Sequence, residues 1–293
     1  MKVSLFSQCV VDLMFPEVGK SMVAVLERLG IETELPDHQV CCQQPTTNSG
    51  LVKTSLKGVR AQIDAFDGCD FVVGDAGSCV AALKELDQWF EPGDPYHKKA
   101  RDLANRTFEF SQFLYHVLGM RQFGATFNGE KVTYHRSCHM TRLLGERTAP
   151  IEFIQKIDTL NYIEIPHIEN CCGFGGTFSV KMPAISELMV TEKMNDIIAT
   201  DAEILVSADM GCLMNIAGKF NREGKKIKAL HIAEVLNHAV DVTKMDRPDF
   251  EHVSENIAKL HAELPDFEPI AERETVKFSY AERVKNGKML VAK

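Results

Sequence analysis

The chain lacks the features that mark several large classes of protein. No uninterrupted apolar stretch approaches the roughly 18 residues that a membrane-spanning helix needs. Positive charge is not in excess either, because 41 acidic residues against 33 basic ones give a net charge of −8. The composition therefore argues against nucleic acid or an anionic membrane as a partner. The first residues, "MKVSLFSQCV", contain too short an apolar run for a signal peptide.

Nucleotide-binding and hydrolytic patterns are also missing. The segment "CCGFGG" places glycine at positions 173, 175 and 176, but no complete G-x-G-x-x-G follows it. We interpret these glycines as shaping a loop rather than cradling a phosphate. Because no Ser–His–Asp or paired-carboxylate pattern stands out, the sequence assigns no catalytic residue.

Cysteine, in contrast, is plentiful, with nine in 293 residues of otherwise ordinary composition. Without a secretion signal, we expect a cytoplasmic protein. In that reducing compartment, cysteines more often bind metal or carry redox chemistry than form structural disulfides.

Eight of the nine cysteines form two quartets with one pattern: a single cysteine, an adjacent pair and another single cysteine. The gaps are 31 and 36 residues in the first quartet and 32 and 39 in the second. The flanking segments also match, since "KVSLFSQC" resembles "KVTYHRSC" and "DFVVGDAGSC" resembles "EILVSADMGC". These matches indicate an internal repeat. The quartets are Cys9, Cys41, Cys42 and Cys79, then Cys138, Cys171, Cys172 and Cys212.

Each half of the chain alternates short apolar runs with helical patterns. Such alternation predicts an α/β fold with two Rossmann-like βα halves, each built on a mostly parallel sheet. We place the first cysteine-rich repeat at residues 1–122 and the second at 123–245. Residues 246–293 contain 18 charged residues and no cysteine, and we expect a helical extension there. That extension either packs back on the body or docks on a partner subunit or a second copy.

The quartet cysteines all follow predicted strands. Since the carboxyl ends of parallel strands meet at one edge of a sheet, the four cysteines of each half are expected to converge. Four thiolates suit either zinc or an iron–sulfur cluster. No C-x₂-C knuckle is present, and adjacent cysteines are poorly placed to share one tetrahedral ion or a disulfide. Unused relics and thiol redox chemistry are the remaining alternatives.

Several residues near the quartets have a structural and a functional interpretation. Cys69 has no counterpart in the repeat, and we interpret it as a small buried apolar residue. His135 and His139 flank Cys138, where each is either a ligand or proton donor or, as we favour, a satisfied core or surface residue. Asp75 and Asp209 precede the terminal cysteines, and we expect them to shape loops rather than transfer protons.

The quartets resemble those of tandem cysteine-rich CCG proteins. That group includes the cysteine-rich subunit of heterodisulfide reductase and the iron–sulfur subunits of glycolate and anaerobic glycerol-3-phosphate oxidation. Within it, "CCQQPTTNSG", "RSCHMTRLLG", "CCGFGGTFSVKMPAISELMVTEK" and "ADMGCLMNIAGK" most resemble the lactate utilisation protein A family. The resemblance covers residues 1 to about 240.

This resemblance implies an iron–sulfur subunit of a complex that oxidises L-lactate, or a related 2-hydroxy acid, to pyruvate. It also implies that all eight quartet cysteines bind clusters of 4Fe–4S type, with the non-cubane form as an alternative. Other iron–sulfur subunits would be its partners, because the chain has no flavin or nicotinamide fingerprint for hydride transfer. Two alternatives are reduction of a disulfide at a cluster, as in heterodisulfide reductase, and a zinc–thiolate binding or regulatory protein without turnover.

Two departures from the family pattern concern the sites themselves. The fullest motif ends in C-x-x-C, whereas Ala76 and Asp209 stand three residues before the terminal cysteines. Gln43 follows the first adjacent pair, where the family has glycine and the second repeat has Gly173. Because glycine readily adopts positive φ, this change predicts that the first site is the one that is altered, empty or filled with zinc.

Overall fold

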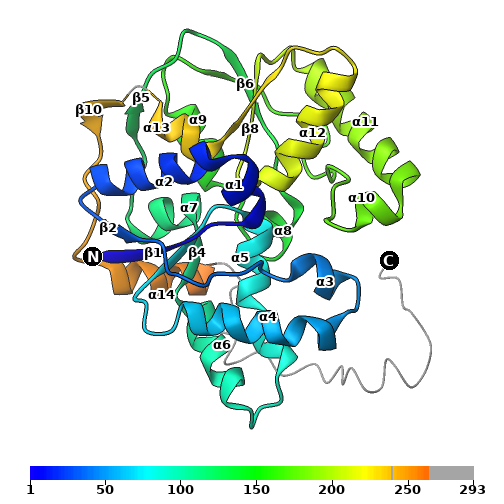
Figure 1. The fold of residues 1–293 in the computed structure, drawn as a ribbon. Helices are drawn as coiled ribbons and strands as arrows, with labels where there is room; N and C mark the ends of the chain where they lie inside the picture. Colours follow the sequence, from blue (N-terminus) through cyan, green and yellow to red (C-terminus); the bar gives the residue numbers. More distant parts are fainter. Residues whose placement is uncertain (239, 264–293) are drawn as a thin grey trace.

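The computed structural model describes residues 1–238 and 240–263, which form two four-stranded parallel sheets and a two-stranded one. The first repeat contains one parallel sheet and the second repeat the other (Figure 1). The sheet of the first repeat has the order β2-β1-β3-β4, formed by β1 (Lys2–Phe6), β2 (Glu32–Glu34), β3 (Val72–Gly74) and β4 (Thr107–Glu109). The sheet of the second repeat has the order β7-β6-β8-β9, formed by β6 (Lys131–Tyr134), β7 (Asn161–Tyr162), β8 (Ile204–Ser207) and β9 (Lys228–His231). The two matching strand orders confirm the predicted pair of βα halves.

Helices connect the strands in both repeats. The helices of the first repeat are α1 (Cys9–Met14), α2 (Pro16–Arg28), α3 (Gln44–Asn48), α4 (Val52–Ala65), α5 (Gly77–Lys84), η1 (Leu86–Trp89), α6 (Pro95–Asn105), α7 (Phe110–Gln112) and η2 (Phe113–Val117). The helices that follow are α8 (Cys138–Arg142), α9 (Ala149–Gln155), α10 (Phe178–Lys181), α11 (Pro183–Ala199), α12 (Met210–Arg222), α13 (Ile232–Asn237) and α14 (Val253–Glu263). Within the described ranges, none of these helices is long and apolar enough to cross a membrane.

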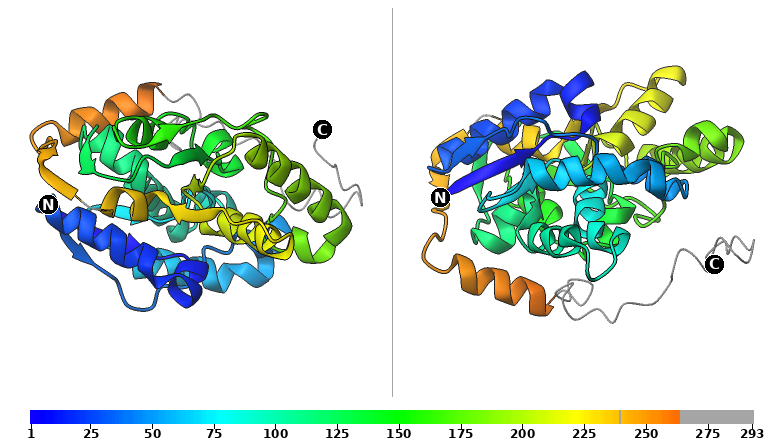
Figure 2. Two further views of the ribbon diagram at one scale, coloured as in Figure 1. Left: turned by 90° about the horizontal axis from the view of Figure 1, so that it is seen from above. Right: turned by 60° about the horizontal axis from the view of Figure 1, so that its bottom comes forward.

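The small third sheet joins the end of the second repeat to its beginning. Strand β10 (Val240–Met245) pairs antiparallel with β5 (Phe123–Ala125). The predicted helix of the extension is present as α14, which packs on η2 with Val253 and Leu260 buried. This part of the extension therefore lies against the body. Figure 2 shows α14 and α2 on opposite sides of the molecule.

Some elements were not predicted from the sequence. The alternating apolar and helical patterns did not predict strand β4, helix α6, the π-helical turn η2 or strand β5. Strand β4 completes the first sheet by pairing with β3, as β9 completes the second by pairing with β8. The predicted boundaries at residues 122 and 245 remain a proposal, and residues 264–293 lie outside the described ranges.

The two repeats share a hydrophobic core. The largest group of mutually packed buried side chains includes Leu5 from β1 and Val206 from β8. Helix α2 of the first repeat packs on α13 of the second, and the Arg28 guanidinium donates to Asn237 Oδ1 at 2.9 Å. The repeats therefore form one folded unit and not two separate bodies.

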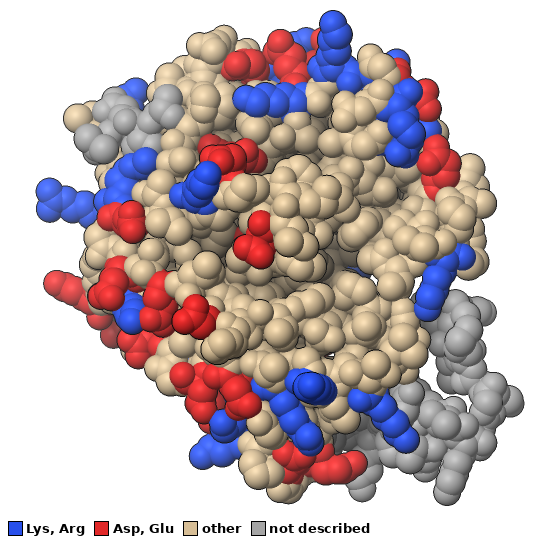
Figure 3. Space-filling model, viewed as in Figure 1, with Lys and Arg blue, Asp and Glu red and all other residues tan. Residues whose placement is uncertain are grey.

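Exposed apolar side chains gather on two groups of helices. Leu13 and Met14 on α1 are 79% and 60% exposed, and Leu188 on α11 is 68% exposed. Val180 of α10 is 80% exposed. On the face drawn in Figure 3, most Lys, Arg, Asp and Glu side chains lie around the rim, whereas uncharged residues fill most of the middle.

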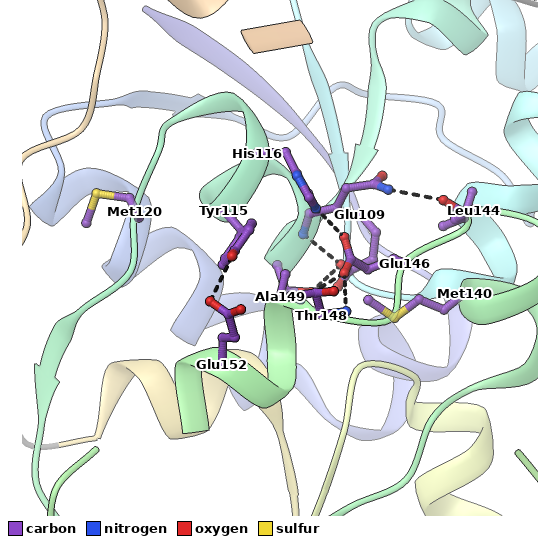
Figure 4. Close-up of polar contacts among 12 residues, drawn as sticks. Glu109, Tyr115, His116, Met120, Met140, Leu144, Glu146, Thr148, Ala149 and Glu152 are labelled. Carbon is purple, nitrogen blue, oxygen red and sulfur yellow. Dashed lines mark hydrogen bonds and ion pairs between the residues drawn. The ribbon is translucent and has the colours of Figure 1, made fainter. Parts of the chain in front are cut away.

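A buried polar cluster lies where β4 and α7 meet the loop after α8 (Figure 4). Glu146 accepts hydrogen bonds from His116 Nε2 at 2.8 Å and from the backbone N–H groups of Thr148 and Ala149 at the start of α9. Burial alone would raise the pKa of Glu146, but the hydrogen bond and charge of His116 hold it below its ordinary value.

Glu109 lies in the same cluster, and no salt bridge to it is found among the described residues. Its Oε2 accepts from Ser111 and from the backbone N–H of Gln112, while Oε1 has no hydrogen-bond partner within the described structure. Burial raises the pKa of Glu109 to about 7. Glu109 is therefore protonated at neutral pH far more often than an exposed glutamate.

We expect this carboxyl group to make stability depend on pH. Between the ordinary glutamate pKa and about 7, the unfolded chain loses a proton that the folded chain retains, so stability falls as pH rises. Replacement by glutamine, Glu109→Gln, removes this contribution. The free energy of urea unfolding of the wild type relative to the variant should decrease by about 2 to 3 kcal/mol between pH 5 and pH 8. If the unfolding free energies of the two proteins changed with pH in parallel, this assignment to Glu109 would be contradicted.

Candidate metal centre

The quartet cysteines lie at the carboxyl-terminal edges of the two parallel sheets. Cys9 and Cys138 are the first residues of α1 and α8, which follow β1 and β6. Cys79 and Cys212 are the third residues of α5 and α12, which follow β3 and β8. The adjacent pairs lie in the loops after β2 and β7. Hydrogen bonds from Cys42 and Cys172 lower the pKa values of Cys79 and Cys212, but burial and the nearby Asp209 carboxylate outweigh them, so both pKa values lie above the ordinary value.

The four thiols of the first quartet contact one another in a row. Cys41 hydrogen-bonds with Cys42 and with Cys9. The row continues from Cys42 Sγ, which donates to Cys79 Sγ at 3.2 Å. Cys9 is exposed at one end, whereas Cys42 and Cys79 are buried at the other.

The second quartet has the same arrangement. Cys171 hydrogen-bonds with Cys138 and Cys172, and Cys172 in turn hydrogen-bonds with Cys212. Backbone groups also donate to this row, since Gly173 N–H lies 3.4 Å from Cys171 Sγ. The structure thus brings each predicted quartet together, although their role as ligands remains a proposal.

The two rows share one electrostatic pattern. Hydrogen bonds from neighbouring thiols, Cys42 in the first row and Cys138 in the second, lower the pKa values of Cys41 and Cys171. The corresponding donation to a central sulfur raises the pKa values of the leading thiols, Cys9 and Cys138. In each row, the first thiol to lose its proton is therefore Cys41 or Cys171, the first cysteine of the adjacent pair. Thiolate is the form that binds metal.

The row geometry fits a group with more than one metal atom. A single tetrahedral ion holds its four ligands equivalently around one point. Here Cys41 contacts Cys9, and Cys42 contacts Cys79, so the four sulfurs follow one another in a line and do not surround a single point. Soft thiolate donors in this number suit iron–sulfur clusters.

Asp75 and Asp209 hold the loops of the terminal cysteines, as predicted. Both carboxylate oxygens of Asp75 accept from Gln8 N–H, at 3.1 and 3.2 Å. Asp209 caps α12 by accepting from Gly211 N–H and also accepts from Ser78 N–H across the repeats, at 3.0 and 3.1 Å. Asp75 thereby holds the backbone just before Cys9, and Asp209 holds the starts of α12 and α5. Burial raises the pKa of Asp75 to about 8.

The two histidines that flank Cys138 differ in their surroundings. His139 Nδ1 accepts from the Gln44 side-chain amide at 2.9 Å, so this histidine is satisfied as expected. His135 is fully buried, and neither ring nitrogen has a hydrogen-bond partner within the described residues. One ring nitrogen, Cys172 Sγ and Cys212 Sγ all lie within 4.8 Å of one another. The interpretation of His135 as a satisfied core residue is therefore wrong.

A buried lysine also faces the second row, and it was not among the predicted site residues. Lys193 on α11 is fully buried, and its Nζ donates to the His167 carbonyl oxygen at 3.0 Å. Burial lowers its pKa, whereas the nearby carboxyl of Asp196 and the thiols of Cys172 and Cys171 favour its charged form. The only sequence signal was a lysine at a position of α11 that otherwise reads as apolar. Lys193 supplies a compensating charge for thiolates in this site.

The loops after the adjacent pairs have the same backbone turn despite their different residues. Gln43 has φ +66°, and the equivalent Gly173 has φ +82°. The Gln43 side chain folds back so that Nε2 donates to the Cys41 carbonyl oxygen at 2.8 Å. The first loop therefore makes the turn without glycine. The first site was predicted to differ because Gln43 was expected to prevent positive φ, and that expectation is wrong.

The two cysteine loops also contact each other. Ser49, just after α3, hydrogen-bonds Thr177 Oγ1 at 2.8 Å, and a Cβ on Gly176 would lie 3.3 Å from Pro45. Cys69 takes no part in either row. It lies before β3, where its thiol contacts Glu34 Oε1 at 3.8 Å, whereas Cys79 lies after that strand.

Known proteins match this chain over most of its length. The cysteine-rich domain family CCG matches twice, over residues 3–84 and 132–217, and each match contains one quartet. "Lactate utilization protein A" of Oceanobacillus iheyensis is 51% identical over 238 residues, which cover 81% of this chain and 97% of that protein. The protein of the same name from Bacillus subtilis is 47% identical over 237 residues, covering 81% and 99%.

We expect the equivalent positions 43 and 173 to differ in their tolerance of alanine. In Gly173→Ala the new Cβ would lie 2.7 Å from the Ser186 carbonyl oxygen, in addition to the strain of positive φ. This variant should lose about 2 to 5 kcal/mol of unfolding free energy. Gln43→Ala keeps the strain already present and loses a hydrogen bond worth about 1 kcal/mol. Urea unfolding of the metal-free proteins measures both, and equal losses would contradict this account.

Proposed function

Because this chain belongs to the lactate utilization protein A family and contains two CCG cysteine-rich domains, we propose that it serves lactate utilisation as an iron–sulfur electron-transfer subunit. The observation that carries the proposal is the row of four thiols at the carboxyl edge of each sheet. Oxidation of L-lactate to pyruvate releases two electrons, and a bound cluster supplies one-electron transfer.

The residues of the two quartets would hold one group in each repeat. Cys9, Cys41, Cys42 and Cys79 form the first site, and Cys138, Cys171, Cys172 and Cys212 form the second. Both are proposed to be occupied by 4Fe–4S-type clusters, because Gln43 preserves in the first loop the turn that glycine makes in the second. Helix starts and backbone N–H groups that face the sulfurs would offset the negative charge of such clusters.

The chain is proposed to act within a complex of iron–sulfur subunits in the cytoplasm. It has no fingerprint for a flavin or nicotinamide, so another subunit must take hydride or electrons from lactate. Cys9 is exposed, and the exposed Leu13 and Met14 follow it on the same short helix. This arrangement gives a partner an apolar contact beside one end of the first thiol row.

Anaerobic reconstitution with iron and sulfide tests whether each row holds a cluster. Cys42→Ser and Cys172→Ser should each lower iron per chain by about half, because each removes a central donor from one of two equivalent rows. Cys69→Ser is the matched control and should bind as much iron as the wild type. The measurements are iron and sulfide per chain and visible absorbance. Colourless wild-type protein that contains only zinc would contradict the electron-transfer role.

The lactate role is tested in the assembled complex. Addition of L-lactate should bleach the iron–sulfur absorbance of this subunit, and D-lactate is the stereochemical control. The isolated subunit should show no bleaching, since it has no hydride acceptor of its own. When Cys172→Ser is assembled into the complex, the part of the L-lactate bleaching that belongs to the second row should be lost, provided that the complex forms in equal yield. An intact complex whose absorbance does not respond to lactate would refute the substrate assignment.

A further inference from the structure

The backbone of His135 is firmly held, and its side chain is not. Its N–H donates to the Val206 carbonyl oxygen at 2.8 Å, and its carbonyl oxygen accepts from Ser207 Oγ at 2.9 Å. These bonds fix the residue at the end of β6, between the central strands of the second sheet. The imidazole projects into a fully buried position where both nitrogens lack hydrogen-bond partners in the part of the chain that is described.

An unsatisfied buried imidazole is costly. A buried polar group without a partner costs about 1 to 3 kcal/mol, and most native structures avoid that cost. The sulfurs of the second row lie close enough to offset this cost, since Cys172 Sγ, Cys212 Sγ and one His135 ring nitrogen lie within 4.8 Å of one another. Such spacing leaves room for a metal atom between the three donors, and imidazole and thiolate are both ligands for iron and zinc.

The first repeat has no such nitrogen. Phe6 occupies the equivalent position, because it precedes Cys9 by three residues just as His135 precedes Cys138. Phe6 packs edge-on against Phe66 in the same buried cluster as Cys42 and Cys79. The first repeat therefore places a hydrocarbon ring where the second places a metal-binding one.

We propose that His135 is a fifth ligand of the second site, binding through one ring nitrogen to a metal atom held by the thiolates of that row. The first site is then all-thiolate, and the second is a mixed thiolate–imidazole site. This inference rests on the proposed function only in that the rows bind metal. Each thiolate ligand carries a negative charge, whereas a neutral imidazole carries none. The second site would therefore have one more ligand than the first but the same total ligand charge.

Nitrogen coordination can be measured directly in the iron-loaded, full-length protein. The protein is labelled with nitrogen-15 histidine, reconstituted with iron and sulfide, reduced, and studied by pulsed electron paramagnetic resonance. Wild type should show the strong coupling of a directly bound histidine nitrogen. His135→Phe, which copies the first repeat, should lose that coupling. His139→Gln is the matched control, because it removes the other flanking imidazole, and it should retain the coupling.

A second measurement uses Co²⁺ alone on the metal-free protein. X-ray absorption at the cobalt edge should show the outer-shell scattering of imidazole in wild type and in His139→Gln but not in His135→Phe. The affinity of the second site for Co²⁺ should fall at least about tenfold in His135→Phe, as it does when groups that merely orient a ligand are lost. If His135→Phe does not fold, His135→Asn replaces it.

The outcomes separate the two proposals. Protein that binds Co²⁺ through His135 but takes up no iron refutes the iron–sulfur function and leaves the ligand assignment standing. Protein that binds iron without histidine coupling, or whose coupling survives in His135→Phe, overturns the ligand assignment and leaves the function standing. Failure to bind either metal overturns both.

Discussion

Both thiol rows depend on the close approach of the two repeats at the starts of α5 and α8. A Cβ added to Gly77 would lie 2.5 Å from Met140 Cβ, so a residue without a side chain is needed at this contact. Gly77 N–H donates to the Ala208 carbonyl oxygen at 3.2 Å, which ties the start of α5 to the end of β8. The helix that carries Cys79 is thereby positioned by the repeat that carries the other row.

The reverse dependence also holds. Val11 and Val18 of the first repeat belong to the same buried cluster as Cys172, Cys212 and Leu213 of the second. His231, at the end of β9, hydrogen-bonds through Nε2 to the Asp75 carbonyl oxygen at 2.9 Å, beside the first row. Each repeat therefore supplies walls and hydrogen bonds to the other's site. A single CCG repeat would leave apolar surface and buried polar groups of its own row uncovered.

Much of this arrangement could be predicted from the sequence, and the limits have physical causes. The quartets and the internal repeat follow from local patterns. Strand β4 is only three residues long, and its pairing with β3 is a tertiary contact that no periodicity signals. Gln43 adopts positive φ because its carbonyl oxygen accepts from Thr46 and Thr47 and its side chain bonds Cys41, which a rule based on glycine alone does not anticipate.

The chemistry of the two sites is decided by side chains at matched positions of one shared backbone. Phe6 and His135 precede the leading cysteines by equal distances. Gln62 and Lys193 are both buried, and each is the eleventh residue of its helix, α4 or α11. Gln62 accepts from Val40 N–H, whereas Lys193 brings a positive charge toward the thiols. At both positions the first repeat has a neutral residue and the second a basic one. Because the local charge sets how readily a thiolate-bound group accepts an electron, the cluster proposed for the second row would be the easier of the two to reduce.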